Sequence, residues 1–300
     1  MDRLDAMSIL VKVVETGSLS AASRRLGAPL PTISRKISEL EAHLDARLLI
    51  RSTRKLILTD AGAAYVAACK RILEQVGDAE RAASGEYSTP KGDLIITAPI
   101  VFGRLHVLPA ITEFLAMYPE IDVRLVLSDR NMDLIGDQID IALRVGPLPD
   151  SSLVATRVGA VSRVVCGSPA YFAAHGIPKA PAELSALTAV VFDALGSASS
   201  WNFLMPGSKA VQAVAIRSRL AVNTAEAAID AAIAGVGVTR VLSYQVAHAV
   251  VQRKLQIVLP NYEPDPLPVS LVYGGQGLLP LKIRAFLDFA APRIRARLER

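Results

Sequence analysis

Eight basic side chains stand between residues 20 and 58, in a segment that holds only three acidic ones. They are Arg24, Arg25, Arg35, Lys36, Arg47, Arg51, Arg54 and Lys55. This local surplus equals the net charge of +5 of the whole chain of 300 residues. Guanidinium and ammonium groups bind phosphate oxygens, so a surplus confined to one short segment predicts a polyanionic partner there.

A helix-turn-helix is predicted around these charges. Apolar residues recur at intervals of three and four over residues 4–14, which predicts a first helix. Ser18 is expected to cap a second helix, and Gly27 to close it. A third helix then begins within residues 29–31, because proline is tolerated only in the first turn of a helix.

The third helix is expected to turn short polar side chains and one arginine outward. Its apolar stripe consists of Ile33, Ile37, Leu40 and Leu44. At about 100° per residue, Arg35 points away from this stripe. Short side chains allow close approach to the major groove, and a guanidinium can bind guanine or phosphate. A solvated helix face is the alternative, but the tight turn and the basic surplus favour DNA recognition.

A short β-hairpin is predicted over residues 51–59, RSTRKLILT, because apolar residues alternate with polar ones after a basic turn. As a wing it would reach the DNA backbone or the minor groove, and a solvated hairpin tip is the alternative. The predicted DNA-binding residues are Ser18, Arg24, Pro31, Thr32, Ser34, Arg35, Ser38, Arg51, Thr53 and Arg54.

The first sixty-odd residues resemble the winged helix-turn-helix of LysR-type transcriptional regulators. The matching pattern runs through Gly17-Ser18, Ala22, Leu26, Pro31, Ser34-Arg35, Ile37, Leu40-Glu41, Leu44, Leu48, Arg51, Leu58-Thr59 and Ala61-Gly62. Three positions depart from the family pattern. Leu30 replaces a usual polar residue, Asp45 a usual glycine and Leu49 a usual phenylalanine.

A long helix from Thr59 to about Ser84 carries a second apolar pattern. Its members, spaced four and three apart, are Tyr65, Cys69, Ile72, Val76, Ala79 and Ala83. Such a heptad seam needs a partner helix. An intramolecular partner is one alternative, but the N-terminal module is too small to cover this length, which favours a second copy of the chain. The predicted dimerisation residues are Tyr65, Cys69, Ile72, Val76 and Ala79.

Strands and helices alternate beyond residue 93, which predicts an α/β fold with a parallel sheet. We therefore expect a winged helix-turn-helix over residues 1–59, a linker helix and hinge over 60–92, and a ligand-binding domain over 93–300. The LysR resemblance, weaker in this region, implies two α/β subdomains similar to periplasmic binding proteins. Their expected bounds are about 93–162 with 267–300 for the first, and about 163–266 for the second.

A ligand is expected beyond the carboxyl ends of the strands, where helix N-termini can bind an anionic group. The predicted effector-binding residues are Thr97, Pro99, Ile100, Ser128, Arg144, Val145, Asn223, Thr224 and Gly237. For Arg144 two roles are open, a clasp for a carboxylate or an ion pair with Asp140 or Asp150. The expected effector is a small anionic molecule bound between the two subdomains.

The predicted function is that of a DNA-binding transcriptional regulator controlled by this effector. The resemblance implies a homodimer or homotetramer on a dyad-symmetric promoter site, with RNA polymerase as a further candidate partner. No cofactor or metal is expected. No membrane partner is expected either, since no apolar run reaches the roughly 20 uninterrupted residues that a bilayer requires. The N-terminus, MDRLDAMSIL, carries no basic leader before an apolar core, which favours a cytoplasmic location.

Two other functions remain as alternatives. A cysteine-based redox-responsive regulator would need Cys69 and Cys166 to meet. A cytosolic small-molecule binding protein or enzyme without specific DNA binding would need a catalytic motif or cofactor site for its chemistry. The sequence has no Walker loop, no GxSxG and no HExxH, and its four histidines follow no mutual spacing. We therefore do not expect an enzyme.

Overall fold

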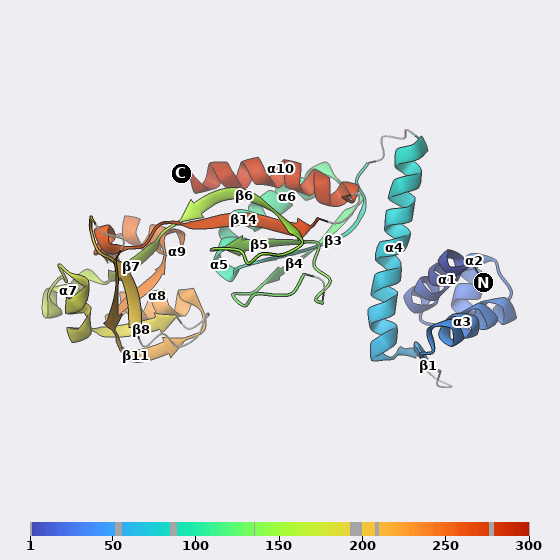
Figure 1. The fold of residues 1–300 in the computed structure, drawn as a ribbon, viewed down its shortest axis with the longest axis horizontal. Helices are drawn as coiled ribbons and strands as arrows, with labels where there is room; N and C mark the ends of the chain where they lie inside the picture. Colours follow the sequence, from blue (N-terminus) through green and yellow to red (C-terminus); the bar gives the residue numbers. More distant parts are fainter. Residues whose placement is uncertain are drawn as a thin grey trace. The chain divides into compact units, whose positions relative to one another are not determined.

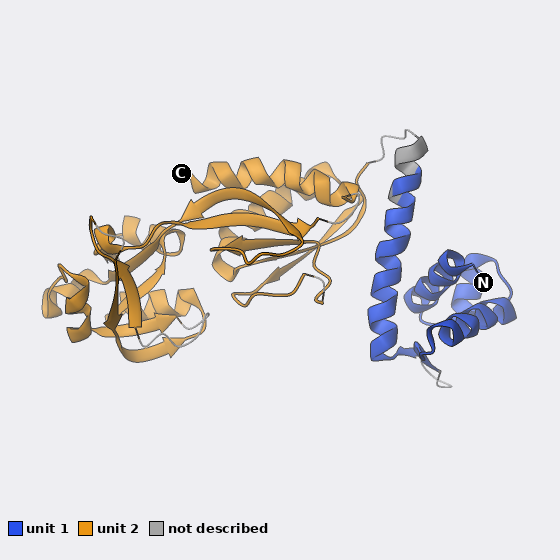
Figure 2. Cartoon of the chain, in the orientation of Figure 1, with its two compact units in different colours: residues 1–88 blue, residues 89–300 orange. Residues whose placement is uncertain are grey.

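The computed structural model describes residues 2–51, 56–84, 89–134, 136–192, 200–207, 210–275 and 279–299. The chain divides into two compact units, residues 1–88 and residues 89–300 (Figure 2). Each unit has its own hydrophobic core.

The first unit begins with three helices and a two-stranded hairpin (Figure 1). The elements are α1 Arg3–Thr16, α2 Leu19–Leu26, α3 Leu30–Leu44, β1 Leu49–Arg51 and β2 Leu56–Leu58. Ser18 caps α2 as expected, because its side chain accepts a hydrogen bond from the Ala21 amide at 3.1 Å. Gly27 ends that helix with a φ of 64°, a left-handed conformation that glycine adopts without strain.

The apolar stripe of α3 holds this unit together. Ile33, Ile37 and Leu40 are completely buried, as the spacing predicts. Leu26, expected on the buried face of α2, is 38% exposed because it is the last residue before the turn. Asp45 occupies the position after α3 with a φ of 47°, which makes it one of the rare non-glycine residues in the left-handed region.

The long helix α4, Asp60–Ser84, starts at the predicted cap. The Thr59 hydroxyl accepts a hydrogen bond from the Gly62 amide at 2.9 Å. The N-terminal half of α4 packs on α1, where Val66 is 6% exposed and Cys69 is completely buried. The predicted seam therefore has an intramolecular partner over its first turns.

The second unit contains two five-stranded sheets. The first sheet has the strand order β4-β3-β5-β14-β6, with bounds Ile121–Leu127, Gly92–Ala98, Ile141–Val145, Leu267–Gly274 and Leu153–Val161. The helices packed on it are α5 Ile100–Phe102, a π-helical segment Gly103–Val107, α6 Leu108–Met117 and α10 Leu281–Leu298. Its core includes Phe102, Phe114 and Phe286, all completely buried.

The second sheet has the order β11-β8-β12-β7-β13, with bounds Arg217–Val222, Thr188–Phe192, Val238–Leu242, Arg163–Gly167 and Gln256–Val258. Helices and 3₁₀ segments around it are α7 Pro169–His175, Pro181–Ala186, α8 Ala225–Ile233, α9 Ser243–Val251 and Pro260–Tyr262. A separate hairpin, β9 Ser200–Leu204 and β10 Val211–Ala215, adds Trp201 and Phe203 to the neighbouring core.

The sheets are mixed, whereas the sequence pattern predicts parallel ones. In the first sheet β14 runs antiparallel to β5 and β6, and in the second β7 runs antiparallel to β12 and β13. The sequence pattern also predicts a short helix over residues 132–138, but its described residues form turns and irregular backbone. The spacing Asn223-x-x-Glu226 predicts a helix cap at Asn223, but the N-cap of α8 is Thr224, since the Thr224 hydroxyl accepts from the Ala227 amide at 3.3 Å.

The helical stretch from Ile100 to Met117 has a mean hydropathy of 1.4 over 18 residues. By length and composition alone it is, among the described helices, the one that could also cross a membrane. In this fold it packs on the first sheet instead, and 39% of its residues are buried.

Replacing Ile37 by aspartate tests the core of the first unit. Ile37→Asp places a charge without a partner at a position with no solvent exposure. We expect the first unit to lose about 3 kcal/mol of stability or more, which denaturant unfolding followed by circular dichroism would measure. Ala42→Asp, an exposed position on the same helix, is the control and should leave the unfolding midpoint nearly unchanged. Equal stability of the two variants would contradict the burial of this stripe.

Candidate functional site

The outward face of α3 has the composition predicted for a DNA-reading surface. Arg35 keeps 68% of its side chain exposed while its Nη1 donates to Glu39 Oε1 at 3.0 Å. Pro31 and Ser38 are exposed, and Thr32 and Ser34 are half-buried at the edges of the same face. The exposed Arg24 lies on α2, next to the turn.

Lys36, like Arg35, is engaged in an ion pair. Lys36 pairs with Asp5 of α1, so it ties α3 to α1 rather than projecting outward. The Ser18 hydroxyl is occupied as the cap of α2. Arg51 is the last residue of β1, whereas Thr53 and Arg54 lie outside the described residues.

The predicted dimerisation residues divide into two groups along α4. Cys69 is completely buried and Tyr65 packs against the core of its own unit. Cys69 is therefore removed from the set that could meet a second copy, because α1 already covers it. Further along, Ile72 is 38% exposed and Ala79 is exposed, with Val76 half-buried.

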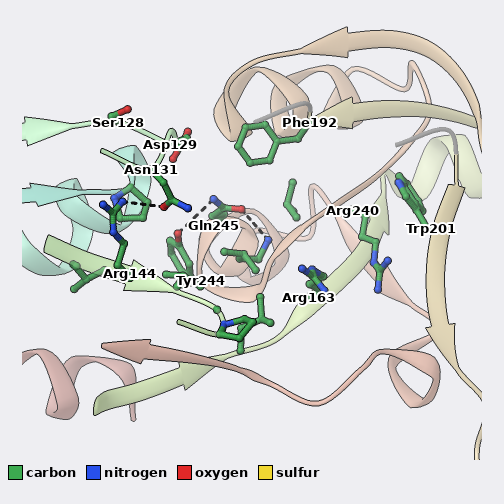
Figure 3. A pocket seen from close by; sticks show the side chains of 18 of the residues that line it. Ser128, Asp129, Asn131, Arg144, Arg163, Phe192, Trp201, Arg240, Tyr244 and Gln245 are labelled. Atoms are coloured by element: carbon green, nitrogen blue, oxygen red, sulfur yellow. Dashed lines mark hydrogen bonds between the residues drawn. The ribbon is translucent and has the colours of Figure 1, made fainter. Parts of the chain in front are cut away.

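A cavity of about 460 Å³ lies between the two sheets of the second unit (Figure 3). Four of the predicted effector-binding residues line it, namely Pro99, Ser128, Arg144 and Val145. All four stand at or just beyond the carboxyl ends of β3, β4 and β5, which is where the topology rule places a ligand.

The other five predicted residues serve the fold. Thr97 is 2% exposed and its hydroxyl donates to the Val126 carbonyl at 3.0 Å. The Ile100 amide donates to Asp129 Oδ1 at 3.1 Å, so Ile100 fixes a lining residue without lining the cavity. Thr224 caps α8, with the exposed Asn223 before it. Gly237 faces the backbone of β8, where an added Cβ would lie 2.4 Å from the Thr188 carbonyl oxygen.

The opposite wall of the cavity comes from the second sheet and the elements around it, and none of the three residues predicted there, Asn223, Thr224 and Gly237, lines it. The residues on this wall include Arg163, Phe192 and Arg240 of the sheet, Trp201 and Asn202 of β9, and Tyr244 and Gln245 of α9, with Asp129 and Asn131 added from the first sheet's side. Arg163 opens β7, which runs antiparallel to β12. The beginning of β7 therefore meets the carboxyl end of β12, and a search limited to carboxyl ends misses it. In the sequence, the feature that could have indicated this position is the single arginine directly before the apolar residues of β7.

Three arginines make the cavity positively charged. Burial lowers the pKa of Arg144 and of Arg163, and the neighbouring charge of Arg240 lowers the pKa of Arg163 further. An arginine remains protonated under any ordinary condition, so a depressed pKa here marks cations that have lost water. Arg144 donates to Asn131 Oδ1 at 2.9 Å and to the Met132 carbonyl, so it takes neither of the aspartate partners considered from the sequence.

Arg240 is neutralised by a buried carboxylate. Its Nε donates to Glu263 Oε2 at 3.2 Å, and both side chains are buried, with 9% and 6% of their surfaces exposed. The Arg240 guanidinium also lies 4.7 Å from the centre of the Phe203 ring. Burial raises the pKa of Glu263 while the adjacent Arg240 opposes that shift.

Tyr244 supplies a polar group between the charged residues. Burial raises the pKa of its hydroxyl, and the negative charge of Asp129 adds to this, so the hydroxyl stays neutral. Gln245 Nε2 lies 3.5 Å from this hydroxyl (Figure 3). A neutral hydroxyl can donate to a ligand oxygen, which suits a cavity that binds an acid.

Neither cysteine is placed for thiolate chemistry. Cys69 and Cys166 are both completely buried, each in the core of its own unit. Burial raises the pKa of Cys69 and raises that of Cys166 to about 12. Within the described ranges, no group of three or more histidine, cysteine or acidic side chains is arranged to hold a metal ion.

Comparisons with known proteins match both units. Residues 4–63 match the bacterial regulatory helix-turn-helix protein family, lysR type, and residues 88–295 match the LysR substrate binding domain. An HTH-type transcriptional regulator of Xanthomonas campestris is 37% identical over 95% of this chain and 84% of its own length. The Escherichia coli transcriptional activator AaeR is 35% identical over 96% of this chain and 93% of its own.

Solved structures agree with the sequence relatives. CrgA of Neisseria meningitidis, a LysR-type transcriptional regulator, is 30% identical with a TM-score of 0.61 over 97% of this chain and 98% of its own. The Vibrio cholerae virulence activator AphB is 28% identical with a TM-score of 0.60, over 96% and 98% of the two chains. Both units thus match one known architecture, and this chain is a member of the LysR family of DNA-binding transcriptional regulators, which are not enzymes.

Proposed function

We propose that this regulator responds to a small anionic effector in the cavity of the second unit. The observation that carries this proposal is the set of three arginines on the cavity wall, of which only Arg240 has a carboxylate partner in the described chain. Half-buried cations without a negative partner are costly, and an acid that enters the cavity would relieve that cost.

The proposed DNA contacts lie on α3 and around it. Arg35 is the side chain that reaches furthest, while Pro31, Thr32, Ser34 and Ser38 allow the helix to approach base edges closely. Arg24, Arg51, Thr53 and Arg54 are proposed to bind the DNA backbone. A protein with two such helix-turn-helix regions reads two half-sites with dyad symmetry, separated by whole turns of the double helix.

The proposed homodimer uses the half of α4 that α1 leaves uncovered. Ile72, Val76 and Ala79 follow the heptad spacing beyond Cys69, and Ile72 keeps 38% of its surface exposed. Two copies of this helix pairing side by side would cover these residues. A homotetramer built from such dimers, and a cytoplasmic location, complete the proposal.

The proposed control is a population shift. An effector that contacts both walls of the cavity binds one arrangement of the two sheets better than others. The effector can change the affinity for DNA only as far as its own affinities for the two arrangements differ. By thermodynamic linkage, bound DNA changes the affinity for the effector by the same factor.

Replacing Arg35 tests the DNA-binding face. We expect Arg35→Ala to fold normally, since the side chain is 68% exposed, and to lose about tenfold or more in affinity for specific sites. Purified protein would be mixed with sheared genomic DNA, and bound fragments sequenced at several salt concentrations. Arg124→Ala, an exposed arginine in the second unit, removes the same charge and should recover the same sites as the parent protein. An unfolded Arg35→Ala protein would show that this arginine is structural.

Placing a charge on the uncovered seam tests the homodimer. Ile72→Glu would bury two like charges at a two-fold interface, so we expect association to weaken by about a hundredfold or more in sedimentation experiments. Ala63→Glu, nine residues earlier and on the opposite side of α4, is the control and should assemble normally. Unchanged assembly of Ile72→Glu would place the interface elsewhere.

A further inference from the structure

The three cavity arginines differ in how their charges are balanced. Arg240 is held by Glu263 and by the Phe203 ring, so it is a structural residue. Arg144 donates to two neutral acceptors, Asn131 Oδ1 and a backbone carbonyl, which orient it without cancelling its charge. Within the part of the chain that the structure describes, the Arg163 guanidinium makes no hydrogen bond or ion pair.

Arg163 is the best placed of the three for binding an external anion. Residue 163 and residue 165 point to the same side of β7, and Val165 pairs with Arg240, so the two arginines share one face of the second sheet. The nearby Glu263 is already hydrogen-bonded to Arg240. Figure 3 shows Arg163 next to Arg240, with Tyr244 and Gln245 between this pair and Arg144.

The opposite wall carries a negative charge. Among the described residues that line the cavity, Asp129 is the only acidic side chain. The Ile100 amide holds its Oδ1 at 3.1 Å, and its buried Oδ2 has no hydrogen-bond partner among the described residues. Burial raises the pKa of Asp129, the hydrogen bond from the Ile100 amide opposes this shift, and the neighbouring Glu226 adds to it. In its ionised form Asp129, with no cation paired to it in the described chain, would repel a second negative charge of a ligand at this end.

We infer that the cavity selects a monocarboxylate with an apolar body, in which Arg163 binds the carboxylate and Asp129 rejects ligands that carry a second acid. This inference rests on the proposed anionic effector and deepens it. The apolar body would lie against Phe192 and Trp201, the aromatic side chains that line the second sheet's side of the cavity.

The chain provides its own reporter for this inference. Trp201 is the only tryptophan among the 300 residues, is 6% exposed and lines the cavity. Its fluorescence would be recorded in the full-length protein during titration with two matched pairs of acids, and calorimetry would check each affinity. One pair is hexanoate and adipate, and the other is benzoate and terephthalate. Within each pair only the second carboxylate differs.

We expect each monocarboxylate to bind at least about tenfold tighter than its dicarboxylate partner. Arg163→Gln should weaken both monocarboxylates by about tenfold or more, because it removes the charge that binds them. Arg163→Lys keeps the charge and serves as the conservative variant, with partial binding expected. Arg219→Gln, an exposed arginine on β11, is the control and should bind like the parent protein.

Asp129→Asn separates repulsion from lost packing. The amide oxygen can still accept from the Ile100 amide, so the fold is kept while the charge is removed. We expect the dicarboxylates to gain about tenfold in affinity and the monocarboxylates to change little. Asp122→Asn, on the exposed side of β4, is the matched control and should preserve the preference for one charge.

Three results would overturn the inference. Equal or tighter binding of the dicarboxylates by the parent protein would reject the selection against a second charge, yet would leave an anionic effector in place. Unchanged binding after Arg163→Gln would reject this arginine as the anchor. If no acid bound at millimolar concentration, the proposed anionic effector would be rejected together with the inference, and the DNA-binding experiment on Arg35→Ala would still decide the role of the first unit.

Arg240→Gln distinguishes the structural arginine from the binding one. It leaves the Glu263 carboxylate buried without its partner, so the unfolding midpoint followed by Trp201 fluorescence should fall clearly. Arg163→Gln should leave that midpoint near the parent value, since its guanidinium has no partner to lose in the described chain. A larger loss of stability from Arg163→Gln than from Arg240→Gln would reverse the two assignments.

Discussion

The second unit is constrained by two backbone crossings between its sheets. Ser162 alone joins β6 of the first sheet to β7 of the second, and residues 259–266 return from β13 to β14. On each side the crossing strands are hydrogen-bonded neighbours, β6 with β14 and β7 with β13 (Figure 1). Arg163 and Leu267, the first residues after the two crossings, both line the cavity. Any change in the angle between the sheets therefore changes the cavity.

Charge placement gives this cavity its chemistry at a cost in stability. Arg240 and Glu263 lose their hydration, and their hydrogen bonds and the Phe203 ring offset part of that loss. Glu263 is hydrogen-bonded to Arg240 and lowers the charge of the two neighbouring arginines by one, so Arg163 and Arg240 together keep one uncancelled positive charge. Away from bulk water, the attraction of this charge to a ligand is stronger than in water.

The sequence was sufficient for the helix-turn-helix because its signals are local. Ser18, Gly27, Thr59 and the α3 stripe each act within four or five residues, and each is found where it was predicted. The cavity was only half predictable, because strand direction depends on pairing between distant segments. Arg163 was missed on an antiparallel strand, and the cap of α8 was assigned to Asn223 although both Asn223 and Thr224 suit a cap. The heptad spacing on α4 predicts a seam, but spacing does not say that α1 covers Cys69.

The division into two units limits how a ligand can influence DNA binding. The proposed DNA-binding face belongs to residues 1–88 and the cavity to residues 89–300. In the proposed oligomer, a ligand in the cavity would act on DNA binding through the arrangement of the chains. The uncovered part of α4 lies in the first unit, next in sequence to the second. Pairing of two copies there would constrain the positions of the two helix-turn-helix regions relative to each other. Control by the effector then requires only that two such arrangements differ in their affinity for the ligand.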